Sequence, residues 1–270
     1  MNQEKILGTD GLLRCPVCGE TTEKVMDFPL MDGSGNKRKM KVHCMCRCER
    51  EAKEAYDNRM KFEEEQRRID NLRKLSLMDA KLKGVRFSNY EENEDNRKVL
   101  GIAKSYVENF DKMYANGQGI LFWGNVGTGK SYTAAAIANE LLVRLQSVIM
   151  TSFIRLLDEM SGYENDDGEY ISRLNQAKLL IIDDLGAERG TDYALEKVYD
   201  IIDSRYRSGK PIILTTNLEF SEMKNCTDIR YNRIYDRIFE MCYPVKMNGF
   251  SWRKKGAAAR SAEVKRILEG

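Results

Sequence analysis

The sequence predicts an α/β protein in which a five-stranded parallel sheet is covered by helices on both faces. Three observations lead to this fold class. Short apolar segments alternate with longer helical segments from Gly84 onward. A glycine-rich turn, Gly124–Ser131, stands between one apolar segment and the helix that follows it. A second apolar segment ends in two adjacent carboxylates, Asp183 and Asp184. Strands that alternate with helices are joined by right-handed crossovers, which make the sheet parallel.

The elements of the sheet domain can be placed from their apolar pattern. Each expected strand is a nearly continuous apolar run, which is typical of a sheet that is buried on both faces. These strands lie near 119–123, 147–153, 178–184, 211–216 and 243–247. The helices are expected near 96–115, 131–145, 153–161, 169–176, 192–208 and 228–241. Only about 23 residues follow the last strand, so any helical lid after it must be small.

Composition divides the chain into three parts. Residues 1–48 form a cysteine-bearing module, residues 49–83 form a helical linker, and residues 84–270 form the sheet domain. The linker is dense in charges of both signs and contains no proline or glycine, which favours one long helix. Its second half carries an apolar stripe that predicts docking at this end, and the stripe is Ile69, Leu72, Leu75, Met78 and Leu82.

Five of the seven cysteines fall within the first 48 residues. Two close pairs of thiolates can complete a tetrahedral structural zinc site. Such a site can supply ~10–16 kcal/mol of apparent folding free energy to a module that is too small for a large core. The expected ligands are Cys15, Cys18, Cys46 and Cys48. Cys44 and His43 are possible substitutes, and the alternative is a set of reduced cysteines without metal.

The segment Gly124–Ser131 fits the Walker A pattern and stands between a strand and a helix, as that pattern requires. Its glycines let the backbone fold around phosphates, and its amides face the anion at a helix N-terminus. Lys130 would reach the β- and γ-phosphates of ATP, and Ser131 would ligate Mg²⁺. The expected nucleotide contacts are Gly124, Asn125, Gly127, Thr128, Gly129, Lys130, Ser131 and Tyr132.

Two further strands end in polar residues on the side where a parallel sheet binds its ligand. Asp183 would hold the magnesium shell, and Asp184 would orient or activate the attacking water. Asn217 follows the strand near 211–216 and could hydrogen-bond the γ-phosphate or that water. An asparagine also suits an ordinary turn, so this third assignment depends on the first two.

Three arginines share one face of the helix expected near 228–241, because they are spaced three and four residues apart. Exposed arginines on a packed helix suit a finger that reaches the γ-phosphate of a neighbouring subunit. These residues are Arg230, Arg233 and Arg237. The alternative is surface pairing with Asp236 and Glu240.

Composition narrows the class of protein further. The net charge of +2 does not itself indicate a nucleic-acid-binding protein. Residues 251–270 carry six basic and two acidic side chains, so they could contact phosphates or form a solvated end. No apolar run approaches the ~20 residues of a membrane helix. No signal peptide is visible, so we expect a cytoplasmic protein with no membrane partner.

Over residues 119–253 the chain resembles the AAA+ replicative helicase loaders of the DnaC/DnaI type, of the sort carried by Gram-positive bacteria and their prophages. The motifs that carry the resemblance are Gly124–Ser131, Leu179–Gly186, Thr215–Asn217, Arg233–Arg237 and Ser251–Arg253. The resemblance implies an AAA+ core with a reduced lid, self-association in the ATP-bound state, single-stranded DNA binding and delivery of a hexameric DnaB-type helicase. Some of these loaders carry a zinc-binding, helicase-docking domain, with which the cysteine module is consistent.

The resemblance also implies roles for single residues. Arg237 takes the arginine-finger position, and Arg233 supports it. Arg253 resembles the sensor 2 arginine, which contacts the nucleotide bound to its own subunit. Thr191 and Tyr193 match the segment that meets single-stranded DNA, where a tyrosine could stack on a base.

The acidic pair departs from the family pattern at one position. Asp184 stands where many AAA+ proteins have glutamate. The shorter side chain implies slow hydrolysis of ATP to ADP and phosphate, as in a switch.

The expected function is therefore ATP-dependent loading of a replicative helicase. A transposition helper ATPase of the IstB type shares the same core, but that family typically lacks a cysteine module. A P-loop nucleotide kinase would need phosphate-binding arginines in a lid, and the acidic segment 154–177 offers only Arg155 and Arg173. A non-hydrolysing adaptor would not need both Asp183 and Asp184.

Overall fold

The computed structural model describes residues 5–30, 35–161, 167–187, 191–249, 251–252, 261 and 264–269. The chain divides into two compact units, residues 1–67 and 68–270. Within the described ranges, no helix is both long enough and apolar enough to cross a membrane.

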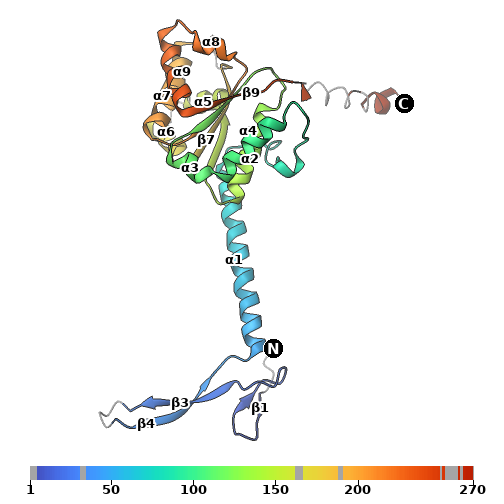
Figure 1. Cartoon of the computed structure of the whole chain (residues 1–270), viewed down its shortest axis with the longest axis vertical. Helices are drawn as coiled ribbons and strands as arrows, with labels where there is room; N and C mark the ends of the chain where they lie inside the picture. Colours follow the sequence, from blue (N-terminus) through green and yellow to red (C-terminus); the bar gives the residue numbers. More distant parts are fainter. Residues whose placement is uncertain are drawn as a thin grey trace. The chain divides into compact units, whose positions relative to one another are not determined.

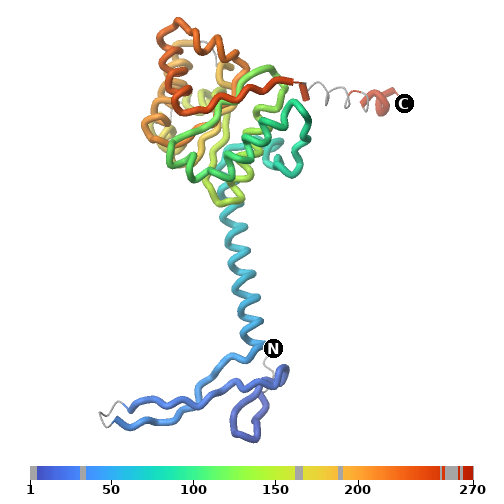
Figure 2. The backbone as a smooth tube through the Cα atoms, in the orientation of Figure 1, coloured from blue at the N-terminus to red at the C-terminus, as the bar shows by residue number. Residues whose placement is uncertain are grey.

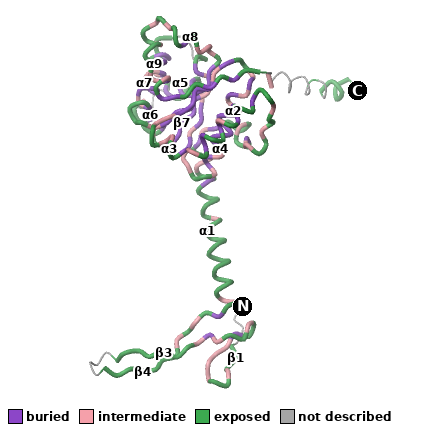
Figure 3. The backbone as a smooth tube through the Cα atoms, viewed as in Figure 1, coloured by how far each residue is buried: buried purple, intermediate pink, exposed green. Residues whose placement is uncertain are grey.

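The first unit is built from two small antiparallel pairs of strands and the start of a long helix. Its elements are β1 (Ile6–Leu7), β2 (Leu13–Arg14), β3 (Glu23–Pro29), β4 (Lys37–His43) and the first part of α1 (Arg47–Leu75). Among its described residues only Cys15, Thr22 and Cys46 are buried. Figure 3 accordingly colours almost all of this unit as exposed or intermediate. This unit therefore has almost no apolar core in its described part.

The second unit contains the predicted parallel sheet of five strands, of which β7 and β9 are labelled in Figure 1. The strand order is β6-β7-β8-β5-β9. The strands are β5 (Gly119–Trp123), β6 (Val148–Ser152), β7 (Leu179–Leu185), β8 (Ile212–Thr216) and β9 (Cys242–Lys246). The strand order reverses at β5, because β8 lies on one side of it and β9 on the other. Ligands of open α/β sheets bind at the carboxyl ends of strands beside such a reversal.

Helices cover both faces of the sheet, as the two helical layers in Figure 2 show. On one face lie α2 (Arg97–Glu108), α3 (Phe110–Ala115) and α4 (Lys130–Val143). On the other face lie α5 (Phe153–Met160), α6 (Asp167–Gln176), α7 (Asp192–Arg207), α8 (Phe220–Lys224) and α9 (Ile229–Met241). Alternate strand residues serve the two cores: Phe122 and Ile181 face α2 and α4, whereas Leu121 and Ile182 face the opposite layer.

A fully buried arginine ties three segments together on the α7 side of the sheet. The Arg205 guanidinium donates hydrogen bonds of 2.8–3.2 Å to the carbonyl oxygens of Ala177, Lys178 and Pro211. Burial lowers the pKa of Arg205 to about 10, so the side chain is still charged at neutral pH. These carbonyl groups precede β7 and β8, and Arg205 therefore fixes the start of two central strands.

The predicted linker helix is shorter than expected. It ends at Leu75 rather than near residue 83, because the Ser76 carbonyl oxygen accepts a 2.7 Å hydrogen bond from the Met150 amide of β6. The apolar stripe is only partly correct. Ile69 and Met78 are buried, but Leu75 is 68 % exposed.

The predicted helix near 96–115 is divided into α2 and α3. Asn109 separates them with a non-helical backbone conformation, and its side-chain amide donates to the Ser105 carbonyl oxygen at 3.0 Å. Asparagine commonly ends helices through such local hydrogen bonds. The short helix α8 was not predicted, because five residues are too few to show a helical period.

Candidate functional site

The glycine-rich turn lies at the carboxyl end of β5 and leads directly into α4. Gly124, Gly127 and Gly129 have φ angles of +123°, +85° and +97°, which side chains rarely adopt. A Cβ atom on Gly124 would lie 2.5 Å from the Met247 carbonyl oxygen, and one on Gly127 would lie 2.2 Å from the Ser251 hydroxyl oxygen. Conformation therefore favours glycine at all three positions, and lack of space adds to this at Gly124 and Gly127.

Lys130 is the first residue of α4 and is only 5 % exposed. Its ammonium group donates hydrogen bonds to the carbonyl oxygens of Gly124 at 2.7 Å and Asn125 at 2.8 Å. The Thr128 hydroxyl group also donates to the Asn125 carbonyl oxygen, at 2.9 Å. The turn thus holds the lysine charge beside the N-terminus of α4, where an anion is favoured.

The two carboxylates of β7 stand at an irregularity in its pairing with β8, between Ile182 and Leu185. The Thr215 hydroxyl group donates a short hydrogen bond to the Asp183 carboxylate. The Thr215 hydroxyl oxygen in turn accepts a 3.0 Å hydrogen bond from the Asp184 amide. Asp184 has a φ of +57°, a left-handed conformation that aspartate tolerates better than most residues. Asp184 lines a cavity at this end of the sheet, whereas Asp183, the expected magnesium ligand, is not among the lining residues and is hydrogen-bonded to Thr215.

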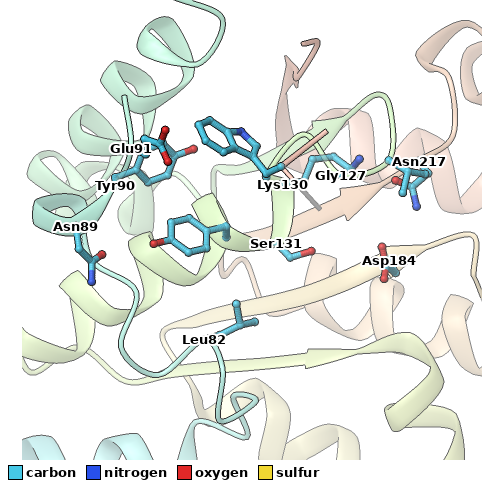
Figure 4. A pocket seen from close by; sticks show the side chains of 13 residues that line it. Leu82, Asn89, Tyr90, Glu91, Gly127, Lys130, Ser131, Asp184 and Asn217 are labelled. Carbon is cyan, nitrogen blue, oxygen red and sulfur yellow. The ribbon is translucent and has the colours of Figure 1, made fainter. Parts of the chain in front are cut away.

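A cavity of about 650 Å³ brings the predicted motifs together (Figure 4). It is lined by Leu82, Asn89, Tyr90, Glu91, Val126, Gly127, Gly129, Lys130, Ser131, Tyr132, Asp184, Asn217 and Trp252. In Figure 4 the Ser131 hydroxyl group points toward the side where Asp184 and Asn217 lie, and Leu82, Asn89, Tyr90 and Glu91 lie on the other side of the loop. One end of the cavity therefore suits phosphates and metal, and the other suits a nucleoside.

The nucleoside end contains residues that the sequence did not reveal. The Tyr90 hydroxyl group lies 2.7 Å from the Thr133 hydroxyl oxygen, and the Tyr90 and Tyr132 rings meet edge to face at 5.4 Å. Burial raises the pKa of Tyr90, so its hydroxyl stays protonated. Only Tyr132 was expected here. Tyr90 lies about forty positions before α4 in the sequence, and no spacing pattern links it to the glycine-rich turn.

The chain after β9 crosses the glycine-rich turn. The Trp252 amide donates to the Gly127 carbonyl oxygen at 3.0 Å, and Ser251 lies against Gly127. The predicted sensor residue, Arg253, lies outside the described residues. Most of the segment in which a reduced lid was expected lies outside them as well.

The three arginines of α9 differ in their surroundings. Arg237 pairs with Asp203 of α7 at 2.6 Å, and its guanidinium carbon lies 4.8 Å from the centre of the Tyr199 ring. Arg230 pairs with Asp228 and Asp192 at 2.9 and 2.6 Å. Arg233 is exposed and lines a second, smaller cavity of about 250 Å³ between α7 and α9. The acidic and aromatic partners of Arg237 therefore come from α7 rather than from Asp236 and Glu240.

The two residues that were expected to contact DNA lie at the start of α7. Thr191 caps this helix, because its hydroxyl oxygen accepts a 3.2 Å hydrogen bond from the Ala194 amide. The Tyr193 hydroxyl group donates to the Met160 carbonyl oxygen at 3.2 Å, and its ring remains 45 % exposed beside the Lys197 ammonium group. The cap accounts for Thr191, whereas Tyr193 keeps a partly exposed ring beside Lys197.

In the first unit, four cysteines lie together: Cys15, Cys18, Cys46 and Cys48. Their sulfur atoms are all within 4.8 Å of one another, which fits the four thiolates of a tetrahedral zinc site. Backbone hydrogen bonds from Glu20 and Cys48 lower the pKa of Cys18 to about 6. A hydrogen bond with the Cys18 side chain raises the pKa of Cys48 to about 12. Ionisation of Cys18 thus makes ionisation of Cys48 harder, and a bound dication would offset this repulsion between thiolates.

The two substitutes lie outside this group. The His43 ring contacts the Glu49 carboxylate at 3.7 Å. The Cys44 thiol donates to the Thr21 carbonyl oxygen at 3.6 Å. The structure therefore brings together the four cysteines expected from sequence and leaves the two alternatives at other contacts.

Known proteins share the larger unit. The chain is 33 % identical over 157 residues to the replicative helicase loader DnaC of Escherichia coli K12, a match that covers 56 % of this chain and 62 % of that protein. A crystal structure of DnaI superposes with a TM-score of 0.55 at 24 % identity, covering 63 % of this chain and 95 % of DnaI. The replication initiator DnaA bound to AMPPCP and single-stranded DNA superposes with a TM-score of 0.52 at 24 % identity, covering 64 % of this chain and 51 % of DnaA.

These structures show that about 63 % of this chain has the fold seen in DnaI and DnaA. The family described as "IstB-like ATP binding protein" matches residues 50–260, which is most of the chain. The cysteine module precedes the matched region, and the nucleotide cavity lies within it. The chain therefore belongs to the IstB-like family of ATP-binding proteins.

Proposed function

We propose that this protein is an ATP-dependent loader of a hexameric, DnaB-type replicative helicase. The observation that carries the proposal is the cavity in which Lys130, Ser131, Asp184 and Asn217 face one another. The similarity to DnaC supplies the partner class, although the matched region spans 62 % of that protein. In this proposal ATP binding and slow hydrolysis act as an assembly switch.

The residues of the cavity have separate tasks in ATP hydrolysis. Lys130 would exchange its two loop carbonyl partners for the β- and γ-phosphate oxygens. Ser131 and Asp183 offer oxygen ligands of the kind that Mg²⁺ prefers, and the ion would neutralise charge on the phosphates. Asp184 would orient the attacking water, and Asn217 would contact that water or the γ-phosphate. ADP and phosphate are the products.

Hydrolysis would be completed by a neighbouring subunit. Arg237 is the proposed finger and Arg233 its support, with Arg253 acting as the sensor within the same subunit. Arg237 is occupied by Asp203 in the single chain, so assembly would have to replace this ion pair with the neighbour's γ-phosphate. The proposal thus ties ATP turnover to self-association.

The other parts of the chain would serve partners. Residues 1–48 would be a zinc-stabilised module that docks the helicase, residues 49–83 a linker, and residues 84–270 the ATPase domain. Single-stranded DNA would meet the start of α7, where the ring of Tyr193 is exposed. A DnaA of similar fold carries single-stranded DNA together with a nucleotide analogue, which supports this pairing of ligands.

The test is loading of the host's replicative helicase onto a closed single-stranded DNA circle coated with single-strand-binding protein. The wild-type chain with ATP should increase helicase-dependent unwinding, and Lys130→Ala should not, because it removes the charge that meets the phosphates. Lys178→Ala is a matched control, since Lys178 lies before β7 and outside the cavity. Unwinding that is unchanged by the wild-type chain would refute the proposal.

A transposition helper of the IstB type is the second candidate, because the matching family carries that name. The two candidates differ in their DNA. A loader should prefer single strands in the presence of ATP, and a transposition helper should bind duplex DNA tightly. Fluorescence anisotropy with the two forms of one labelled sequence separates them.

A further inference from the structure

The antiparallel ribbon of β3 and β4 is exposed along almost its whole length, on both faces (Figure 3). Two-stranded ribbons are marginally stable in water when neither face is covered. Five of its residues and near neighbours are apolar side chains that are 39–51 % exposed: Val25, Met26, Phe28, Leu30 and Met40. An exposed apolar ribbon of this kind indicates a surface that a partner covers.

The register of the ribbon sorts its side chains onto two chemically different faces. Met26 pairs with Met40, and Phe28 pairs with Arg38. Because side chains alternate between the two faces of a strand, these two pairs project on the same face. Lys24 and its partner Val42 continue this face at the other end. We call Met26, Phe28 and Met40, with Lys24 and Arg38 at the two ends, the methionine face.

The opposite face is mainly basic, and its apolar side chains, Val25 and Pro29, stand apart from each other among lysines. Its side chains come from the intervening pairs Glu23–His43, Val25–Lys41, Asp27–Lys39 and Pro29–Lys37. The Lys41 ammonium group donates to the Gly11 carbonyl oxygen at 2.6 Å, which ties this face to the rest of the unit. Lysines and a proline on short strands also discourage further strand pairing at the ribbon edges.

We propose that the methionine face docks an apolar patch, rimmed by carboxylates, on the partner helicase. The proposal rests on the function proposed above and names the surface that serves it. Two thioethers and one aromatic ring gain from contact with apolar groups, and methionine adapts its shape to a partner. Lys24 and Arg38 stand at the two ends of this face, so acidic groups around the patch would complete the contact.

Charge and shape favour a protein partner on the methionine face over a second copy of the ribbon or a nucleic acid. A second copy of the ribbon, docked face to face, would bring Lys24 and Arg38 against cations of its twin, which is unfavourable. A nucleic acid would meet a phosphate-binding row only on the lysine face. The aromatic ring that the register places there is that of His43, and it is held between Lys5 and Glu49 at the end of the ribbon. Burial of Met26, Phe28 and Met40 requires an apolar surface, which a protein supplies.

The experiment measures binding of the full-length chain to the purified helicase of the same host by surface plasmon resonance at physiological salt. Met40→Thr changes the centre of the methionine face, and Lys39→Thr is the matched control on the neighbouring position and opposite face. Threonine suits a strand at both positions. Zinc content and ATP affinity, measured on both variants, show whether each is folded.

We expect Met40→Thr to weaken helicase binding by about tenfold or more, as for a residue at the centre of an interface. Lys39→Thr should change it by less than about threefold. Unchanged binding by Met40→Thr would overturn the docking face while leaving the proposed function intact. A larger loss for Lys39→Thr, together with loss of single-stranded DNA binding, would assign the ribbon to nucleic acid instead. No binding by the wild-type chain would overturn the proposed function itself.

Discussion

Removal of zinc should unfold the cysteine module and leave the ATP-binding unit intact. The perturbation is Cys48→Ser in the full-length chain, which deletes one of four sulfur atoms that lie within 4.8 Å of one another. Cys44→Ser is the matched control, because Cys44 is outside this group and its thiol donates to the Thr21 carbonyl oxygen, a bond that a serine hydroxyl can also make. The two substitutions make the same chemical change four residues apart.

The magnitude follows from the burial of the first unit. Its buried residues in the described part are Cys15, Thr22 and Cys46, so two of the three belong to the sulfur cluster. Even a well-formed core of a chain this short rarely supplies more than ~3–5 kcal/mol. A structural zinc site supplies about 10–16 kcal/mol of apparent free energy. The free energy lost with the metal should therefore exceed the folding free energy that the module has without zinc.

The assay combines metal analysis with amide hydrogen exchange on protein purified without chelators. The wild-type chain and Cys44→Ser should hold about one zinc ion per chain and protect the amides of β3 and β4. Cys48→Ser should lose both the zinc and the protection, with ATP affinity unchanged. Protected amides in a metal-free wild-type chain, or equal zinc loss in both variants, would refute the reasoning.

Four other outcomes test the larger unit. Asp184→Asn should bind ATP normally and release phosphate about 10²–10⁴ times more slowly, because the water loses its base; equal loss of binding would make the residue structural. Arg205→Met should lower the free energy of unfolding by about 3 kcal/mol in urea denaturation, since three buried carbonyl groups lose their donor. Tyr193→Ala should cost about 1–3 kcal/mol of single-stranded DNA binding in anisotropy titrations, with no change in ATP affinity. A mixture of Arg237→Ala and Lys130→Ala should recover part of the hydrolysis that each lacks, and a co-assembled mixture without activity would refute a finger in trans.

The sheet and its nucleotide motifs could be predicted because local patterns encode them. Apolar runs bounded by turns gave all five strands within a residue or two, and the turn between β5 and α4 is specified by glycines that the backbone requires. The four cysteines could be chosen because two cysteines that are close in the sequence can place both sulfur atoms on one metal ion. In these cases the signal lies within a few neighbouring residues.

The features that were missed depend on contacts between distant segments. The end of α1 is set by the hydrogen bond from Met150 to Ser76, which no pattern in the helix reveals. The position of Tyr90 in the cavity and the pairing of Arg237 with Asp203 likewise join segments that are 34 or more residues apart. The spacing of the three arginines in α9 predicted a shared face correctly, but spacing carries no information about acidic partners on another helix.

The crossing of the glycine-rich turn by the chain after β9 gives the protein a built-in optical probe. The sequence has two tryptophans, and each is joined to this turn. Trp123 immediately precedes Gly124, and its ring is covered by Phe220 and the Lys246 ammonium group. Trp252 borders the cavity and is hydrogen-bonded to Gly127. The chain also has 13 tyrosines, so selective excitation of tryptophan isolates emission that originates beside the glycine-rich turn. We expect nucleotide binding to change this emission, which would allow exchange to be followed without a label.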